Sequence, residues 1–509
     1  MKKVKLDQIK MGAVISYLAL GLNIVLGLLY TPWMKDRIGI DNHGLYTLAI
    51  SLISIFMLDF GLGSAVSRFV SKYRAEGRQD KVNEILGVIF KLYIGIDAVV
   101  FVVLSVMYFF LGAIYKGLTP EQIEQFKDLY LIVAGVNIIS FPFSPLNGIL
   151  NAYEKFIQLK VCDLISKVST VAFVVVALCF SSSVVWVVTA NAIGSLLTIL
   201  VKQYIVRKNV PVKPDFKAGG KELYKSLFSF TVWTMIVSIM QRFTHSFAPS
   251  VLGITANATE IGLYTPAVVI EGYFYSIAMA VNGLFLPRVS KYIADKKEEN
   301  ISNLMIKVGR YQLVFLSLIF VGFVCIGRDF MTTWMHGEEY AKSYFCAILI
   351  LIPTLISATQ QIANTTVIAK KLVKYQAICM IVTGTMGLAV SYILSMYIGA
   401  LGVCIGAALA SLVNLVYMNF VYQRKAGINM LAFYKSCYLR AIPCYILTIG
   451  LGLFCTNLIL IEGWGGVIIK GVVTVVIYGA VFGVVYFTNA EKRKFFEYIM
   501  RIFKKDTKK

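Results

Sequence analysis

The chain has 509 residues, of which 58% are apolar and 15% charged, and its formal net charge is +22. The charged residues fall between apolar runs of about 20 residues, the length that crosses a ~30 Å hydrocarbon core as a helix. This pattern excludes a water-soluble globular protein and predicts an all-α, polytopic membrane protein. In a soluble protein such a net charge would suggest nucleic-acid binding. Here the charge follows membrane topology, and no nucleic-acid partner is expected.

The apolar runs predict fourteen transmembrane helices. The first run is too long for a removable signal peptide and lacks a small-residue cleavage site, so we count it as the first span. The predicted spans, in chain order, are 11–34, 43–66, 85–112, 128–150, 161–180, 184–204, 227–250, 259–286, 311–327, 343–368, 376–397, 400–422, 441–460 and 465–488.

The basic residues predict how these spans are oriented. If the N-terminus is cytoplasmic, 39 of the 49 Lys and Arg residues fall in cytoplasmic segments and six in outer loops, the other four lying within spans. This bias is the one that the positive-inside rule requires, and it places both termini in the cytoplasm. The basic segments are expected to contact anionic membrane lipids.

The predicted loops are too short to hold a catalytic domain. In one of the longer outer loops, Thr119 is expected to cap a helix that begins with Pro120. The chain offers neither a nucleophile with a base nor paired catalytic carboxylates, which favours a transporter over an enzyme. Because it also contains no zinc-ligand spacing, nucleotide-binding loop or C-x-x-C pair, no metal and no cofactor is expected.

Part of the sequence occurs twice. The stretch GLYT at 44–47 returns at 262–265, and VSKY at 70–73 returns at 289–292, with offsets of 218 and 219. Such self-similarity indicates a duplicated unit. An even number of predicted spans separates the copies, so they share an orientation, as in a parallel repeat about an axis along the membrane normal.

The repeat predicts the domain organisation. Two pseudo-symmetric six-helix lobes are expected at 1–210 and 227–425, joined by a basic cytoplasmic linker at 211–226. Residues 426–509 would form two appended helices and a basic cytoplasmic tail.

The seventh predicted helix carries a polar face. Its residues recur at spacings of three and four, which places them on one side of a helix: Thr231, Thr234, Ser238, Gln241, Arg242 and His245. Two interpretations remain open. The face is either a hydrogen-bonded seam between helices or a substrate-facing stripe in which Arg242 binds an anion, and His245 is either a ligand or a bystander.

Two acidic residues are candidates for ion coupling. Glu271, in the eighth predicted helix, either pairs with Arg242 or takes up a coupling H+ or Na+. Asp59, in the second helix, is the other candidate, and it could instead brace Arg68. Asn23 in the first helix, with Tyr275 and Asn282 in the eighth, provides neutral polar groups that suit a sugar.

Two further charged groups are expected to have no role in transport. Asp163 and Lys167 are four residues apart in the fifth predicted helix and should pair with each other. Lys470 lies close enough to a helix end for its ammonium group to reach the membrane surface.

The opening of the chain contains a set of short motifs at 31–34 (TPWM), Gly39, 44–46 (GLY), 59–63 (DFGLG) and Arg68. The second half is similar in having Gln241-Arg242 some twenty residues before the repeated GLY. Together these motifs resemble those of bacterial polysaccharide-transporter flippases, which include the O-antigen and capsule-repeat flippases of the multidrug/oligosaccharidyl-lipid/polysaccharide superfamily.

The resemblance implies a MATE-like, V-shaped pair of six-helix bundles in the bacterial cytoplasmic (inner) membrane. It implies alternating-access export of an undecaprenyl-diphosphate-linked oligosaccharide, such as an O-antigen, capsule or exopolysaccharide repeat unit. Coupling of this export to an ion gradient is also expected. Arg242 would then bind phosphate. Glycan polymerase machinery is a further implied partner, and the protein is expected to be a monomer.

Three alternative functions are ranked behind the export of a lipid-linked oligosaccharide. Lipid II flippases of this superfamily tend to place arginines in the first helix, and cation-coupled drug exporters an acidic residue in the first or seventh. This sequence has no charge between Lys10 and Lys35 and departs from both patterns. Drug export is the first alternative and lipid II transport the second. A membrane glycan polymerase or ligase comes last, because a long outer loop is missing.

Overall fold

The structure, a computed structural model, describes residues 2–57, 62–217, 235–242, 246–279, 285–295 and 297–487. Every regular element among these residues is helical. Eleven helices in this part of the chain are long and apolar enough to cross a membrane. The other three predicted spans, 43–66, 227–250 and 259–286, each include residues outside the described ranges. The all-α membrane fold is confirmed, and the count of fourteen spans stays a prediction.

The chain divides into two compact units. Unit 1 comprises residues 1–269 and 373–414, and unit 2 comprises residues 270–372 and 415–509. These bounds differ from those of the predicted lobes because the units group residues by contact, whereas the lobes follow the repeat in sequence. The division into lobes therefore stays a prediction.

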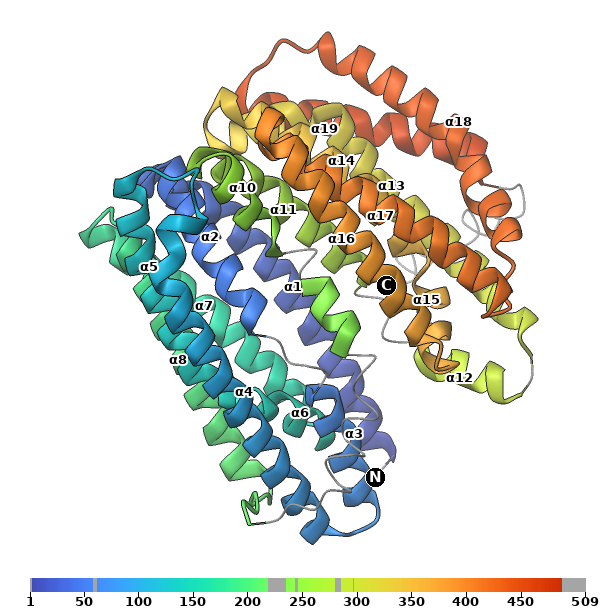
Figure 1. Ribbon diagram of the computed structural model, residues 1–509. Coiled ribbons are helices and arrows are strands. Elements are labelled where there is room, and N and C mark those ends of the chain that lie inside the picture. The colour runs from blue at the N-terminus through green and yellow to red at the C-terminus, as the bar shows by residue number, and fades with distance from the viewer. Residues whose placement is uncertain are drawn as a thin grey trace, which may run out of the picture. The chain divides into compact units, whose positions relative to one another are not determined.

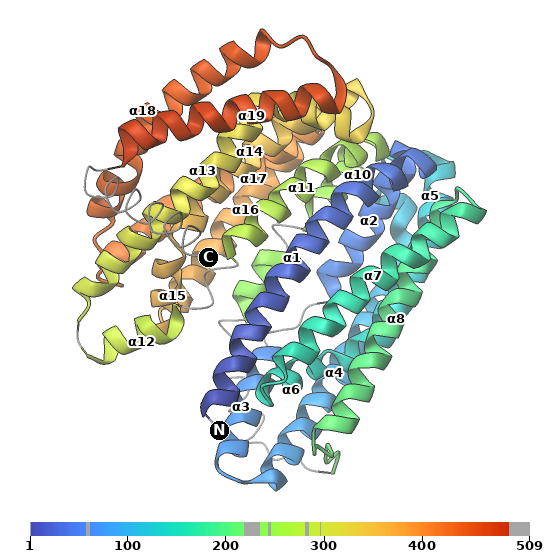
Figure 2. The same cartoon turned by 180° about the vertical axis from the view of Figure 1, so that it is seen from behind.

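Unit 1 consists mainly of long helices that pack side by side. Within it, α7 packs against α1 and α8, while α5 packs against α2, α4 and α8; α7 and α8 lie side by side in both views (Figures 1 and 2). Its helices are α1 (Lys2–Ile38), α2 (Ile40–Phe56), α3 (Leu62–Ala75), α4 (Gln79–Ile114), α5 (Pro120–Ser140), η1 (Phe141–Phe143), α6 (Pro145–Ala152), α7 (Phe156–Phe180), α8 (Val184–Asn209), α10 (Ala248–Thr255), the first part of α11 (Ala258–Met279), α16 (Val373–Ile398) and the first part of α17 (Ala400–Arg424).

Unit 2 is organised around one long helix. Its elements, besides the ends of α11 and α17, are α12 (Leu286–Ala294), α13 (Glu299–Met335), η3 (Glu338–Tyr340), α14 (Ala341–Thr359), α15 (Gln361–Ala369), α18 (Met430–Asn457), α19 (Gly463–Val481) and η4 (Phe482–Tyr486). Helix α13 packs against α14, α18 and α19. A tyrosine hydroxyl from each of these three helices hydrogen-bonds to α13: Tyr344 to the Val324 carbonyl, Tyr445 to the Ser317 hydroxyl and Tyr478 to the Val314 carbonyl.

Local sequence signals set several helix ends. The Thr119 hydroxyl accepts a hydrogen bond from the Gln122 amide, and the Gln122 side chain accepts one from the Thr119 amide. Together they form a capping box, with Pro120 at the first helical position. The predicted cap is confirmed. At the start of α8, the Ser183 hydroxyl accepts a hydrogen bond from the Val185 amide.

Three predicted spans are interrupted: 43–66, 343–368 and 128–150. The span 43–66 was expected to be one helix, but α2 ends at Phe56 and α3 begins at Leu62. The span 343–368 divides into α14 and α15 at Gln360, whose φ and ψ of −99° and 12° lie outside the helical region. The fourth helix of the first copy is likewise divided, into α5 and α6 by η1.

A pair of left-handed residues extends the repeat beyond the stretches seen in the sequence. Glu154, after α6, has φ of 58°, and Lys371, after α15, has φ of 57°. Non-glycine residues rarely adopt this conformation. The two residues are 217 positions apart, close to the offsets of the other matched stretches. Helix α6 of the first copy therefore corresponds to α15 of the second.

The two copies contact each other in register within unit 1. The Thr265 hydroxyl donates to the Thr47 hydroxyl at 3.1 Å, and the Thr259 hydroxyl donates to the Asp41 carboxylate at 2.6 Å. In each pair the partners are 218 positions apart, so each residue meets its own counterpart. Counterparts can meet over successive turns only if the two helices run in the same direction. The predicted shared orientation of these two stretches is thereby supported by direct contact.

Glycine allows this close approach. A Cβ atom on Gly44 would collide with the Ala258 carbonyl and lie 3.1 Å from the Gly262 nitrogen, and a Cβ on Gly262 would lie 2.6 Å from the Ile40 carbonyl oxygen. Gly44 and Gly262 are themselves counterparts in the repeat. Small residues at such crossings let membrane helices pack backbone to backbone.

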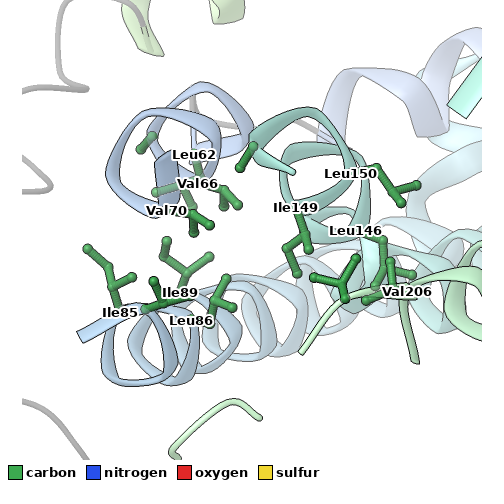
Figure 3. Close-up of a cluster of buried hydrophobic side chains, with 14 of the residues drawn as sticks. Leu62, Val66, Val70, Ile85, Leu86, Ile89, Leu146, Ile149, Leu150 and Val206 are labelled. Atoms are coloured by element: carbon green, nitrogen blue, oxygen red, sulfur yellow. The ribbon is translucent and has the colours of Figure 1, made fainter. Parts of the chain in front are cut away.

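Figure 3 shows the core that holds α3 and α6 on the first part of α4. On α3 the buried residues recur every three or four positions, which gives the helix one apolar face. The opposite faces of both helices are polar. The main members of the core are Leu62, Ala65, Val66 and Val70 from α3, Ile85, Leu86 and Ile89 from α4, and Leu146, Ile149 and Leu150 from α6.

We expect Gly44→Ala to lower the free energy of unfolding by about 1–3 kcal/mol, because the new methyl group overpacks a backbone contact. Gly95→Ala in α4 is the matched control, since nothing lies within 4 Å of its Cβ position and alanine favours a helix by about 1 kcal/mol. Thermal unfolding of the purified variants in detergent measures both. An unchanged melting temperature for Gly44→Ala would contradict the close crossing.

Candidate functional site

The predicted anion site lies in unit 1 on a helical segment at 235–242. Gln241 and Arg242 are exposed on this segment, and Ser238 is half-buried. Thr231, Thr234 and His245, the other members of the predicted stripe, lie outside the described residues. The exposure of Arg242 is compatible with a ligand-facing guanidinium group, and its role stays a prediction.

The remaining candidates are divided between the units. Asn23 is half-buried on α1, while Asp59 and Asn282 lie outside the described residues. Arg242 belongs to unit 1 and Glu271 to unit 2. Both interpretations from the sequence therefore stay predictions: Arg242 and Glu271 pair with each other, or each binds a ligand.

Glu271 has a defined hydrogen-bond partner within unit 2. Its half-buried carboxylate accepts a hydrogen bond of 3.1 Å from the Thr354 hydroxyl of α14. Tyr275 lies one turn further along α11 and is 44% exposed. The end of α11 is also joined to α13, because the Gln312 amide donates to the Ala278 carbonyl at 2.9 Å. Glu271 is thus positioned by a neutral hydroxyl group from the neighbouring helix α14.

A network of amide and tyrosine groups, in which Gln360 is buried and Tyr434 and Asn419 are half-buried, occupies the break between α14 and α15. The Tyr434 hydroxyl accepts hydrogen bonds from the Gln360 amide at 2.6 Å and from the Asn419 amide at 2.7 Å. One turn along α18, the Tyr438 hydroxyl is 2.7 Å from that of Thr359. The sequence analysis did not predict this group. The sequence feature that could have indicated it is the polar pair Gln360-Gln361 in the middle of an apolar run.

A polar cavity of about 780 Å³ opens in unit 1 between α3 and α6. None of its lining residues was predicted as a substrate site. The signal in the sequence was a pair of i, i+4 spacings, Ser67 with Ser71 and Asn147 with Asn151, each on a helix whose other face is apolar. Only the fold brings the two helices together.

One prediction about the other charged residues is wrong. Asp163 pairs with Lys160 at 3.5 Å and with Lys202 of α8 at 3.4 Å, in place of Lys167. Lys470 pairs with Asp329 of α13 at 2.5 Å, and its reach to the membrane surface stays a prediction. In both cases a partner from a neighbouring helix is available, which the spacing along one helix does not reveal.

A family model described as "Polysaccharide biosynthesis protein" matches residues 9–288, which is more than half of the chain. The chain belongs to this family. The polysaccharide biosynthesis proteins fall within the multidrug/oligosaccharidyl-lipid/polysaccharide superfamily suggested by the opening residues, and the predicted resemblance is confirmed. A comparison with the sequences of curated proteins gives no match.

Solved structures of membrane transporters share the fold of this polysaccharide biosynthesis protein. A lipid II flippase, MurJ, in an inward closed conformation is 16% identical with a TM-score of 0.72, over 92% of this chain and 98% of that one. An inward-facing multidrug resistance MATE transporter is 13% identical with a TM-score of 0.66, over 82% and 98% of the two chains. The Vibrio cholerae MATE transporter VcmN in its bent form is 13% identical with a TM-score of 0.56, over 84% and 98%. The protein is therefore a multi-pass membrane protein with a transporter fold.

Proposed function

We propose that this polysaccharide biosynthesis protein is a flippase that exports an undecaprenyl-diphosphate-linked oligosaccharide across the bacterial cytoplasmic membrane by alternating access. The observation that carries the proposal is the family match over residues 9–288. The fold of a lipid II flippase, which covers 92% of the chain, supports it. The protein would act as a transporter and not as an enzyme, and glycan polymerase machinery would take up its product.

The finer architecture is part of this proposal. Fourteen spans would form six-helix lobes at 1–210 and 227–425, with two appended helices after residue 426 and both termini in the cytoplasm. The in-register contact of α2 with α11 supports two copies of one orientation. The matching left-handed residues Glu154 and Lys371 support a repeat that extends over several helices.

Coupling to an ion gradient would use an acidic residue inside the membrane. Glu271 is the stronger candidate, because its carboxylate is half-buried and hydrogen-bonded to Thr354. An intramembrane carboxylate that is costly to ionise suits the uptake and release of H+ or Na+. Asp59 remains the second candidate.

A cation-coupled multidrug exporter is the alternative function. The MATE transporters of the same fold support it. The two functions differ in what must be bound. A lipid-linked glycan requires groups for a diphosphate and for sugar hydroxyls, whereas a drug exporter requires an apolar pocket with a charged group.

We expect Arg242→Ala to abolish export and Arg242→Lys to leave partial activity. The planar guanidinium group can bind two diphosphate oxygens at once, which an ammonium group cannot match. Complementation of a flippase-deficient strain, with expression checked in the membrane fraction, measures the effect. Arg207→Ala is the matched control, because Arg207 is an exposed arginine at the end of α8. Full activity of a well-expressed Arg242→Ala protein would remove Arg242 from the site.

Glu271→Gln should make gradient-driven transport at least about tenfold slower, in the range expected when a proton-carrying group is lost, while binding of the glycan is retained. The amide oxygen of glutamine can still accept the hydrogen bond from Thr354, so only the titratable group disappears. Transport into proteoliposomes with and without an imposed gradient provides the measurement. Glu462→Gln, at an exposed glutamate, is the control. Unaltered gradient dependence in Glu271→Gln would leave Glu271 a purely structural role.

The orientation can be tested with reporter fusions. A reporter inserted after Lys217 should be active only in the cytoplasm, and one near Gly337 only on the outer side, because of the distribution of basic residues. Paired alkaline phosphatase and fluorescent-protein fusions measure this. Swapped activities would show that the predicted number of spans is wrong.

A further inference from the structure

The cavity in unit 1 is lined by polar groups from two short amphipathic helices. Helix α3 contributes Ser67, Arg68 and Ser71, and α6 contributes Asn147 and Asn151, with Gly63 and Gly148 completing the lining. Arg68, Ser71 and Asn147 are exposed, and Ser67 and Asn151 are half-buried. The volume of about 780 Å³ falls within the range of small-molecule sites.

The helices that carry these groups are held rigidly. Their apolar faces are part of the buried core on α4 (Figure 3). The helices also approach each other closely, since a Cβ on Gly148 would lie 2.8 Å from the Gly63 carbonyl oxygen. At their far ends, the Arg74 guanidinium donates to the Ala152 carbonyl at 3.0 Å and lies over the Tyr153 ring. The polar side chains therefore extend from a fixed frame, as a binding site requires.

The chemistry of the lining points to one class of ligand. Among the described residues, the lining side chains comprise one guanidinium, two hydroxyls and two carboxamides, and none of these seven described residues is acidic. Hydroxyls and carboxamides both donate and accept, which suits the paired donors and acceptors of sugar hydroxyls. The guanidinium suits a phosphate or carboxylate. Together they fit a carbohydrate that carries an anionic group.

The second copy of the repeat lacks this lining. Through the offset of 219, Leu286 and Pro287 occupy the positions of Ser67 and Arg68. Through the offset of 217, given by the left-handed residues, Thr365 and Ile368 occupy the positions of Gly148 and Asn151. Ser71 and Asn147 have the counterparts Ser290 and Asn364. Arg68, Gly148 and Asn151 thus have no counterpart of the same type at the equivalent positions, where Arg288 of α12 matches Phe69, although both copies build the same helix pair.

We propose that this cavity is a binding subsite for an anionic carbohydrate group of the transported glycan. Arg68 binds the negatively charged oxygens, and Asn147 and Asn151 bind sugar hydroxyls. This proposal rests on the proposed function. In the predicted orientation α3 and α6 lie toward the cytoplasm, so the subsite would receive the glycan before it crosses the membrane. The negative charge could come from an acidic sugar or from the diphosphate.

Ligand-observed NMR titrations of the purified full-length protein in nanodiscs test the subsite. The probes are a disaccharide containing one uronic acid, its neutral counterpart and inorganic pyrophosphate. Arg68→Gln should weaken binding of the anionic probe that uses the subsite by about tenfold or more, the loss expected for a charge-assisted hydrogen bond. Asn151→Leu should weaken binding of both disaccharides. Lys72→Gln is the matched control, because Lys72 is an exposed basic residue of α3 outside the lining.

The pattern of losses identifies the source of the charge. If Arg68→Gln weakens the uronic acid disaccharide and spares pyrophosphate, the anion is an acidic sugar, and the opposite pattern assigns the diphosphate. The proposal is overturned if wild-type protein binds none of the probes, or if both variants bind all of them as the wild type does. If only the Asn151→Leu variant binds the probes more weakly, the role of Arg68 is overturned.

Failure of the subsite proposal can be distinguished from failure of the proposed flippase function. Saccharide binding that depends on Arg68, in a protein that does not translocate lipid-linked glycans in proteoliposomes, would retain the subsite and reject the flippase. Normal translocation by Arg68→Gln and Asn151→Leu variants with unchanged binding would reject the subsite and retain the flippase.

Discussion

The architecture of unit 1 depends on the parallel, in-register packing of α2 against the start of α11. Gly44 and Gly262 bring the two backbones together, and hydrogen bonds between counterparts fix the register on either side. In a bilayer, apolar side chains gain little from contacting each other instead of lipid. Close backbone packing and hydrogen bonds between side chains therefore carry the association. This contact also explains why residues 248–269 group by contact with the first copy, although they belong to the second in sequence.

A second constraint is that backbone groups inside a membrane must be satisfied by the protein. The fourth helix is nevertheless interrupted in both copies. The polar groups next to the interruption differ between the two copies. In the first copy α6 borders an open cavity. In the second, the buried Gln360 hydrogen-bonds to a half-buried group of tyrosine and amide side chains. The same helical framework thus borders an open cavity in one copy and a hydrogen-bonded side-chain network in the other.

Much of the fold could be predicted because its signals are local. Hydropathy gave the span 376–397 to within a few residues of Val373–Ile398, and the cap at Thr119 depends on only four positions. The break at Gln360 could not be predicted in this way, because its stability depends on Tyr434, which comes from another helix. The partner of Asp163 was missed for the same reason, since Lys202 on α8 competes with the neighbours on its own helix. The cavity joins residues about 80 positions apart, which no spacing rule connects.

The left-handed residues Glu154 and Lys371 record how the chain arose. A non-glycine residue pays about 1–2 kcal/mol to adopt this conformation, and two unrelated turns would have little reason to place a long charged residue there. The shared geometry implies that the turn already existed in a half-length ancestor. The contacts of Thr47 with Thr265 and of Asp41 with Thr259 join each position to its own equivalent, as across the two-fold axis of a symmetric interface. The starts of the two copies therefore contact each other as two parallel subunits of a homodimer would, but within a single chain.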